Sequence, residues 1–297
     1  MMRHIAKSVW NHAACLLLAL TLACGGCAYL RPPETIDGRP VYEVRKADWT
    51  PELKGRWRSP AWKHANTLEV ANFLPQTPEG LAASDHRPVT KARVLYDDKG
   101  LYIHFRVKDQ YVRSVATEYH GRVWEDACVE FFVQPKADRG YFNFEINCGG
   151  TMLLSYHENP NWQGETKREG GAVPKGLARG VKIHHSMPKV VEPEIEGRVT
   201  WQVEYFIPFW LLEEYTGPLG GVAGQEWRAN FYKIAETNSH PHLASWSPIL
   251  EGYSFHQPEF FGTIRFEQQR GCWLRSLCPR HREDKATAEP AIDKGTE

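Results

Sequence analysis

The sequence has no excess of charge of either sign. Its 297 residues include 36 lysines and arginines against 36 aspartates and glutamates. Because affinity for nucleic acid depends mainly on a basic surface, this balance gives no reason to expect such a partner. Hydrophobic residues make up 42% of the chain and charged residues 24%, which is typical of a chain that buries a core. We therefore expect a globular protein and no nucleic acid among its partners.

No apolar run near the N-terminus is long enough to span a bilayer. Residues 15–23 (CLLLALTLA) have instead the length of the apolar part of a secretion signal, and basic residues precede them. The small residues and cysteines that follow resemble a bacterial lipoprotein processing site, with Cys24 as the lipidated residue and Cys27 as a second candidate. Simple cleavage and a retained anchor are the alternatives. We expect export to the periplasm, the cell surface or the medium, with membrane contact only through the signal or a lipid.

The seven cysteines lack the pattern of a metal or haem protein. No paired CxxC motifs indicate structural zinc, and no CxxCH motif indicates covalent haem. Cys128 and Cys148 fall in the expected core, and Cys272 and Cys278 in the C-terminal tail. Because an exported protein can form disulfides, a bond within either pair is possible. For Cys128 and Cys148, free and partly buried thiols are the alternative.

The two ends of the chain differ in composition from its middle. Residues 1–27 are expected to form the signal, 28–36 a linker, and 268–297 a disordered tail that cannot bury a core. Residues 31–60, rich in proline and charge, are expected to lead into the fold. The remaining residues 37–267, roughly 230 in number, fit one all-β domain.

Within this domain the hydrophobic residues alternate with a period of two, which is typical of β-strands. The clearest hairpin covers 91–108, with a turn at 97–100 whose glycine permits positive φ. One face of its second strand is expected to be buried and the other wet: Leu101, Ile103, Phe105 and Val107 against Tyr102, His104, Arg106 and Lys108.

A second hairpin is expected from 127–134 and 141–148. Further strands are predicted at 199–207, 226–234 and 262–266, and a short helix from Pro208. Many short strands with few helical stretches predict an all-β fold. We expect an antiparallel β-sandwich of the jelly-roll or immunoglobulin-like kind, with one or two short helices.

Four motifs resemble, in order and spacing, the family 9 carbohydrate-binding modules. They are residues 94–103 (VLYDDKGLYI), 124–133 (WEDACVEFFV), 245–248 (SWSP) and 255–262 (FHQPEFFG). The resemblance implies a DOMON-like β-sandwich that binds an oligosaccharide or polysaccharide between two aromatic rings and catalyses no reaction. The rings pack on the C–H face of a sugar, and polar side chains meet its hydroxyls. It also implies a role in glycan capture or degradation beside a glycoside hydrolase partner.

The resemblance assigns four residues to the sugar site. Trp124 matches the first stacking ring, and Phe255 matches the second, where tryptophan is usual. Glu130 and Asn147 match residues that hydrogen-bond sugar hydroxyls. Glu145 stands where the family has arginine, and this charge reversal is expected to change which sugar fits. Packing in the core, for the rings, and a solvated strand face, for the polar residues, are the structural alternatives.

The register of the second hairpin decides which of these side chains share a face. Paired residues in antiparallel strands have a constant index sum and point to the same side. A disulfide between Cys128 and Cys148 requires an even sum, whereas Glu130 and Asn147 share a face only if the sum is odd. Without a bulge, the disulfide and the shared polar face exclude each other.

Two other functions compete with sugar binding. Related DOMON-type sandwiches hold haem between methionine and histidine, which Met152, Met187, His184 and His185 offer here. A glycoside hydrolase needs two carboxylates about 5–10 Å apart, which are offered by Asp126, Glu130, Glu145 and Glu204. Nothing in the sequence around these carboxylates predicts one raised pKa beside a normal one. We expect neither haem-linked electron transfer nor catalysis. Modules of this kind usually accompany glycoside hydrolases and can therefore be described with hydrolase terms.

No cofactor is expected, with structural calcium as the open alternative. Calcium prefers oxygen ligands, and carboxylates occur in the expected loops at Asp97, Asp98, Asp109, Glu125 and Asp126. Turn chemistry accounts equally for the first two.

Overall fold

The structure, a computed structural model, describes residues 34–76, 80, 82–158 and 170–268. The predicted signal with its candidate lipidation residue Cys24, and the tail with Cys272 and Cys278, lie outside the described residues. Within the described part, no helix is long and apolar enough to cross a membrane.

The described part consists mainly of strands, with two short α-helices and three 3-10 turns. The strands are β1 Thr35–Ile36, β2 Arg39–Lys46, β3 Leu68–Val70, β4 Asn72–Phe73, β5 Val89–Tyr96, β6 Gly100–Asp109, β7 Val112–Ser114, β8 Cys128–Gln134, β9 Tyr141–Asn147, β10 Met152–His157, β11 Gly170–Ala172, β12 Lys182–His185, β13 Val191–Ile195, β14 Val199–Pro208, β15 Glu226–Ala235, β16 His242–Ser245 and β17 Gly262–Phe266. The helices are α1 Lys175–Ala178 and α2 Phe209–Thr216, and the 3-10 turns are η1 Pro60–Trp62, η2 Val123–Glu125 and η3 Pro258–Phe260.

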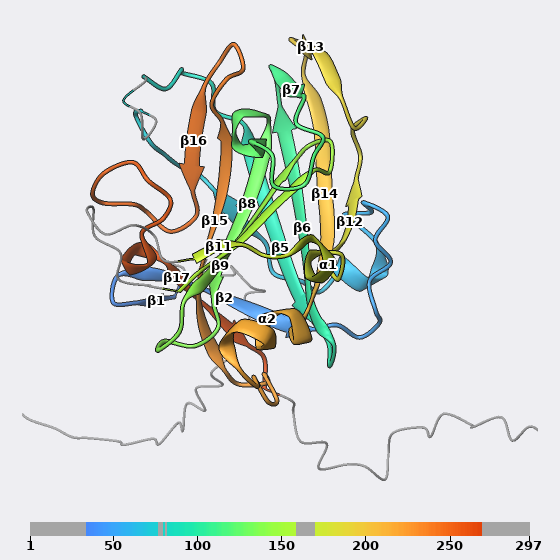
Figure 1. Cartoon of the computed structure of the whole chain (residues 1–297), viewed down its shortest axis with the longest axis vertical. Coiled ribbons are helices and arrows are strands. Elements are labelled where there is room, and N and C mark those ends of the chain that lie inside the picture. The colour runs from blue at the N-terminus through green and yellow to red at the C-terminus, as the bar shows by residue number, and fades with distance from the viewer. Residues whose placement is uncertain (1–33, 77–79, 81, 159–169, 269–297) are drawn as a thin grey trace, which may run out of the picture. The chain divides into compact units, whose positions relative to one another are not determined.

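These strands form a curled β-sandwich, which confirms the predicted fold class (Figure 1). The first sheet has the order β11-β10-β9-β8-β15-β17, and β16 extends it from β15. The second sheet has the order β5-β6-β14-β12, with β3 on β5. Strand β2 joins the two sheets, because its middle pairs with β17 and its end with β5. These two pairings are parallel, and the others named here are antiparallel.

The core between the sheets follows the predicted alternation. Leu101, Ile103, Phe105 and Val107 on β6 are fully buried, as expected. On the first sheet the inward side chains are those of Val129 and Phe131 on β8 and their neighbours on β9 and β15. The residues that alternate with these inward ones along each strand point to the outer face of their sheet. These outer faces are where the protein can bind a ligand.

The outer face of the second sheet is not wet along its length, contrary to the sequence prediction. Tyr102 and His104 on this face are buried, at 4% and 0% exposure. The segment 47–66 covers them, with Trp62 packed edge-on against His104. Residues 39–60, which include β2 and most of this segment, were expected to lead into the fold. They are part of it, because they close one face and join the two sheets.

The second hairpin adopts the odd register. Cys128 pairs with Asn147 and Glu130 with Glu145, so these four side chains share the outer face of the first sheet. Cys148 belongs to the inner core instead, and both cysteines are free and fully buried. The disulfide alternative is therefore wrong, since the two thiols lie on opposite sides of the sheet. Burial raises the pKa of both thiols, that of Cys148 to about 12.

Candidate functional site

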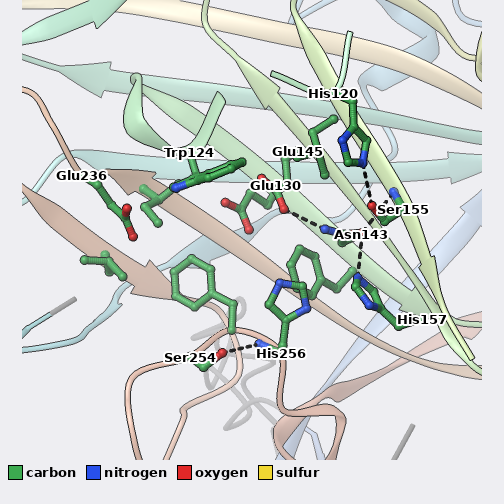
Figure 2. Close-up of a pocket in the computed structure, with 15 residues that line it drawn as sticks. His120, Trp124, Glu130, Asn143, Glu145, Ser155, His157, Glu236, Ser254 and His256 are labelled. Atoms are coloured by element: carbon green, nitrogen blue, oxygen red, sulfur yellow. Dashed lines mark hydrogen bonds between the residues drawn. The ribbon is translucent and has the colours of Figure 1, made fainter. Parts of the chain in front are cut away.

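A pocket of about 340 Å³ lies on the outer face of the first sheet (Figure 2). Strands β8, β9 and β10 form its floor, and the loops around η2 and before η3 form its walls. Its lining consists of His120, Trp124, Glu130, Phe132, Asn143, Glu145, Leu153, Ser155, His157, Ile234, Glu236, Leu243, Ser254, Phe255 and His256. The structure thus brings together three of the four residues predicted for the sugar site.

Trp124 lies in the wall of this pocket and is partly exposed. It lies in η2, in a loop that hydrogen bonds of Asp126 hold in place. The carboxylate of Asp126 accepts hydrogen bonds from the backbone N–H groups of Val115 and Ala116, both at 3.0 Å. Arg122 lies 5.5 Å from the centre of the Trp124 ring. The ring is therefore held at the pocket edge with part of its surface open.

Phe255 lies in the opposite loop and is more enclosed than a ring standing free in solvent, at 6% exposure. Its ring stacks on Tyr232, with centroids 4.0 Å apart and planes 12° from parallel. The Tyr232 hydroxyl also donates a hydrogen bond to the Phe255 carbonyl at 3.1 Å. One face of the Phe255 ring is therefore covered by Tyr232, and this contact orients the ring within the pocket wall.

Glu130 lies on the pocket floor at 2% exposure, directly across from Glu145 on the neighbouring strand. Its Oε2 atom has no hydrogen-bond partner among the described residues. Burial raises the pKa of Glu130 well above its usual range, the charges of Glu145 and Glu236 raise it further, and Lys233 opposes them. Glu130 is therefore a buried carboxyl group with one oxygen that no described residue satisfies.

Polar residues that sequence reasoning missed complete the floor. Asn143 donates to Glu145 Oε1 at 2.7 Å, and its own Oδ1 lies 3.2 Å from His157 Nε2. The hydroxyl of Ser155 lies 2.9 Å from His120 Nε2 (Figure 2). The alternation of polar and apolar residues in β9 and β10 was the available signal. It shows that these residues share a face, but not that loops enclose that face.

Asn147 does not line the pocket, although it shares the face with Glu130. Its amide donates to the Ala116 carbonyl at 2.9 Å and to Asp126 Oδ2 at 2.8 Å, and its Oδ1 accepts from the Thr151 N–H at 2.8 Å. The side chain is fully buried and its polar atoms are used. Asn147 therefore positions the loop that carries Trp124 and is not placed to touch a ligand in this pocket.

The carboxylates considered for calcium are engaged in separate places. Asp97 caps its own turn by accepting hydrogen bonds from the backbone N–H groups of Lys99 and Gly100. Asp126 fastens the η2 loop. Asp109 lies between His86, at 2.8 Å, and the buried ammonium of Lys233, at 3.6 Å. These contacts explain how the three carboxylates are placed, and structural calcium stays an open alternative.

Among the described residues, one group has metal-ligand geometry, His86, Asp109 and His242. The ammonium of Lys233 lies 2.8 Å from His242 Nε2 and already supplies the positive charge there. Burial alone would raise the pKa of Asp109, but Lys233 and His86 lower it below its usual range. A metal ion at this place would meet a buried cation, so we interpret the group as an internal salt-bridge network.

The residues considered for haem are not brought to the pocket. Met152 points into the inner core, and His184 and His185 lie on β12 of the second sheet. The described lining of the pocket contains three histidines and no methionine. The methionine–histidine ligand pair therefore has no counterpart in this pocket.

A family model for carbohydrate-binding family 9 matches residues 76–266. The chain belongs to carbohydrate-binding family 9. The matched range includes both hairpins, the η2 loop and the loop of Phe255, so the family assignment covers the whole pocket. It confirms the resemblance carried by the four motifs. Among curated protein sequences, none matches the chain.

Solved structures agree with this family. One from Bacteroides uniformis, of a protein with a provisional carbohydrate-binding assignment, is 30% identical, with a TM-score of 0.63 over 77% of this chain and all of the other. A family 9 module from Caldicellulosiruptor kristjanssonii is 12% identical. Its glucose complex has a TM-score of 0.50 over 77% of this chain and 97% of the module, and its cellotriose complex 0.50 over 85% and 100%. At that identity the module supports the fold alone.

Proposed function

We propose that this pocket binds one end unit of a glycan, without chemical reaction, in a protein that acts outside the cytoplasm. The observation that carries the proposal is the arrangement of the lining: the rings of Trp124 and Phe255 in two facing loops, and hydrogen-bonding side chains on the floor between them. A sugar offers C–H faces to rings and hydroxyls to polar groups, so it matches both parts. The volume of about 340 Å³ is near the lower end for ligand pockets, which favours a short ligand or a chain end.

In this proposal Trp124 and Phe255 contact the faces of the sugar, and Glu130 accepts hydrogen bonds from its hydroxyls. The backing of Phe255 by Tyr232 and of Trp124 by the Asp126–Asn147 contacts orders both walls before the ligand arrives. Preordered walls lower the entropy cost of binding. Since the family 9 module from Caldicellulosiruptor was solved with glucose and with cellotriose, these are suitable first probes.

Glycoside hydrolysis is the weaker candidate, although Glu130 and Glu145 form a carboxyl pair. Two catalytic carboxyl groups must flank the scissile bond. Here both side chains rise from adjacent strands of the pocket floor, so they meet a ligand from the same side. The carboxylate of Asp126 accepts hydrogen bonds that hold the η2 loop. Glu204 lies on the other sheet, where it accepts a hydrogen bond from Trp62. A hydrolase would therefore be a separate partner protein in the same glycan degradation.

Export and lipidation at Cys24 belong to the same proposal. They are supported by the short apolar run at 15–23 and the small residues after it. Labelling of the expressed protein with a fatty-acid analogue tests this. A Cys24→Ala variant should lose the label, and equal labelling of the variant would exclude Cys24.

The binding proposal is tested by calorimetric titration of glucose and cellotriose into the wild type, Trp124→Ala and Trp49→Ala. Trp49 is the matched control, since it is 63% exposed and does not line the pocket. Loss of a central aromatic contact costs about 2 kcal/mol or more, so we expect Trp124→Ala to weaken binding at least about 30-fold. The control should bind like the wild type. Equal affinity of all three proteins would remove Trp124 from the site.

A further inference from the structure

A second pocket, of about 510 Å³, lies on the outer face of the second sheet, at one end of it. The segment before β5, the end of β6 and the start of β14 form it. Its lining includes Lys108 of β6, which pairs with Val89 on one side and Thr200 on the other. The segment 47–66 covers the middle of this face at His104, whereas Lys108 is exposed. The face is therefore closed over its middle and open at this end.

We call this second pocket the basic pocket, because its lining includes Arg87, Lys108 and Arg198. All three residues are exposed, and none of them forms an ion pair among the described residues. The guanidinium of Arg87 donates instead to the backbone carbonyls of Ser84 and His86, at 2.5 and 2.9 Å. These acceptors are neutral, so they position the group without cancelling its charge. The basic pocket therefore carries three positive charges that no described carboxylate pairs.

The other titratable groups at the basic pocket do not reverse this charge. Asp109 is the one carboxylate in the described lining, and its side chain is only 1% exposed. It lies 2.8 Å from the ring of His86 and 3.6 Å from the buried ammonium of Lys233, so its charge is matched from within the protein. His86 adds positive charge when protonated and none when neutral. Asp85 and Glu196 are exposed and do not line the pocket. The lining is therefore positive in either state of His86.

The remaining lining residues narrow the class of anion that fits. Gln110 and Thr200 offer neutral hydrogen-bonding groups, and Val89 offers an apolar surface that is 48% exposed. A sugar that carries a carboxylate or sulfate group matches all three kinds of partner, because it has a charge, hydroxyls and C–H faces. An inorganic anion uses the charges alone, and the flat surface of a bilayer does not fill a recess. An acidic sugar is therefore the most complementary occupant.

We propose that the basic pocket is a second glycan site, which binds a unit of an acidic polysaccharide with its carboxylate or sulfate group against Arg87, Lys108 and Arg198. The inference goes beyond the proposed function, because this site lies on the other sheet and takes a charged unit. The match to the carbohydrate-binding family spans residues 76–266 and so includes the whole lining. Charged side chains that have no partner in the protein are kept here for a ligand of opposite charge.

Affinity electrophoresis of the full chain tests this site. The native gels contain polygalacturonate, chondroitin sulfate or the neutral polysaccharide pullulan, and the retardation gives an apparent affinity. We expect at least one of the two acidic polymers to retard the wild type. Raising the ionic strength to about 0.5 M should weaken this binding, because salt screens exposed charges.

A double variant, Lys108→Gln with Arg198→Gln, assigns the binding to the basic pocket. We expect it to bind the acidic polymer about tenfold more weakly, since two exposed charged contacts are lost. The matched control is Lys63→Gln with Lys189→Gln. Both lysines are exposed and line neither the basic pocket nor the pocket of the first sheet, and the change in net charge is the same. The control should bind like the wild type, and thermal unfolding of each variant confirms that it is folded.

The outcomes separate this inference from its rivals and from the proposed function. Equal retardation of the double variant and its control, or no retardation by either acidic polymer, overturns the second site. Sodium sulfate and phosphatidylglycerol vesicles are the remaining probes. If the basic pocket binds one of these instead of the polymers, it belongs to an inorganic anion or to a membrane. Cellotriose titrated into the same proteins reports on the pocket of the first sheet: its failure to bind would contradict the proposed function and leave the second site standing.

Discussion

Glu204 and Glu130 are buried glutamates on the outer faces of the two sheets, and they differ in their hydrogen-bond partners. Glu204 on β14 accepts hydrogen bonds from Trp62 Nε1 at 2.7 Å and from the backbone N–H groups of Lys54 and Gly55 at 3.0 and 2.6 Å. Glu130 on β8 keeps an oxygen without a donor among the described residues. Burial raises the pKa of both, but donors surround Glu204, whereas carboxyl groups surround Glu130.

The difference lies in what covers each face. The segment 47–66 closes the outer face of the second sheet and brings its own donors to Glu204. The loops around η2 and before η3 leave the outer face of the first sheet open as a pocket. A closed face needs its polar groups satisfied by the chain, whereas a binding face can leave them for a ligand. An isosteric glutamate-to-glutamine change on each face should therefore have opposite effects on stability.

The largest effect is expected from Glu204→Gln. Whichever way the amide is placed, its NH₂ group meets a donor, either Trp62 Nε1 or the N–H groups of Lys54 and Gly55. We expect the free energy of unfolding in urea to fall by about 2 kcal/mol, because buried donors lose their acceptor. Affinity for sugars should stay within about twofold, since Glu204 lies outside the pocket. Undiminished stability would mean that the 47–66 segment does not depend on this carboxylate.

Glu130→Gln is expected to change stability in the other direction. The folded state raises the pKa of Glu130, so the wild type loses stability as pH rises from the unfolded pKa towards the folded one. Glutamine does not titrate. We therefore expect the variant to be more stable near pH 7 by about 1 kcal/mol or more, since each unit of raised pKa is worth about that much. The gain should shrink towards about pH 4, where the wild-type carboxyl group is protonated in both states.

Urea unfolding of both proteins at several pH values measures this difference. A gain that does not vary with pH would trace the effect to packing rather than to the carboxyl charge. A variant that is less stable at every pH would show that Glu130 is satisfied in the folded protein. Higher stability of the variant together with weaker sugar binding would be the sign of a group retained for binding at a cost to folding.

The comparison of the faces also shows where sequence reasoning succeeds and stops. The strand periodicity and the four motifs predicted the sandwich, the hairpins and the grouping of Trp124, Phe255 and Glu130 about one place. They did not show that Tyr102 and His104 are covered while Asn143, Ser155 and His157 face a pocket. Alternation tells which residues share a face, but what lies over that face depends on loops far away in the chain.

Asn147 illustrates the same limit within one strand. It shares the face of Glu130, as the odd register requires. It lies one pleat beyond Glu145, however, under the η2 loop, where Ala116 and Asp126 use its amide. The match to a family motif gave the face of Asn147, but not the contacts of its amide with the η2 loop, because the alternation of residues does not contain the position of a loop over a strand.

The smallest expected effects come from removing one hydroxyl on each sheet. Tyr232→Phe keeps the ring that stacks on Phe255 but loses the hydrogen bond to the Phe255 carbonyl. We expect stability to fall by about 1 kcal/mol and sugar affinity to fall about two- to threefold, because the loop of Phe255 is held less firmly. Calorimetry and urea unfolding measure the two effects.

The matched change on the second sheet is Tyr205→Phe. The buried Tyr205 hydroxyl has no hydrogen-bond partner among the described residues, and the pocket lies on the other sheet. Its removal should leave affinity unchanged and stability equal or slightly higher, since an unsatisfied buried polar group is lost. If Tyr232→Phe left affinity unchanged as well, the wall formed by Phe255 would not depend on its hydrogen bond to Tyr232. The ring stacking alone would then hold it.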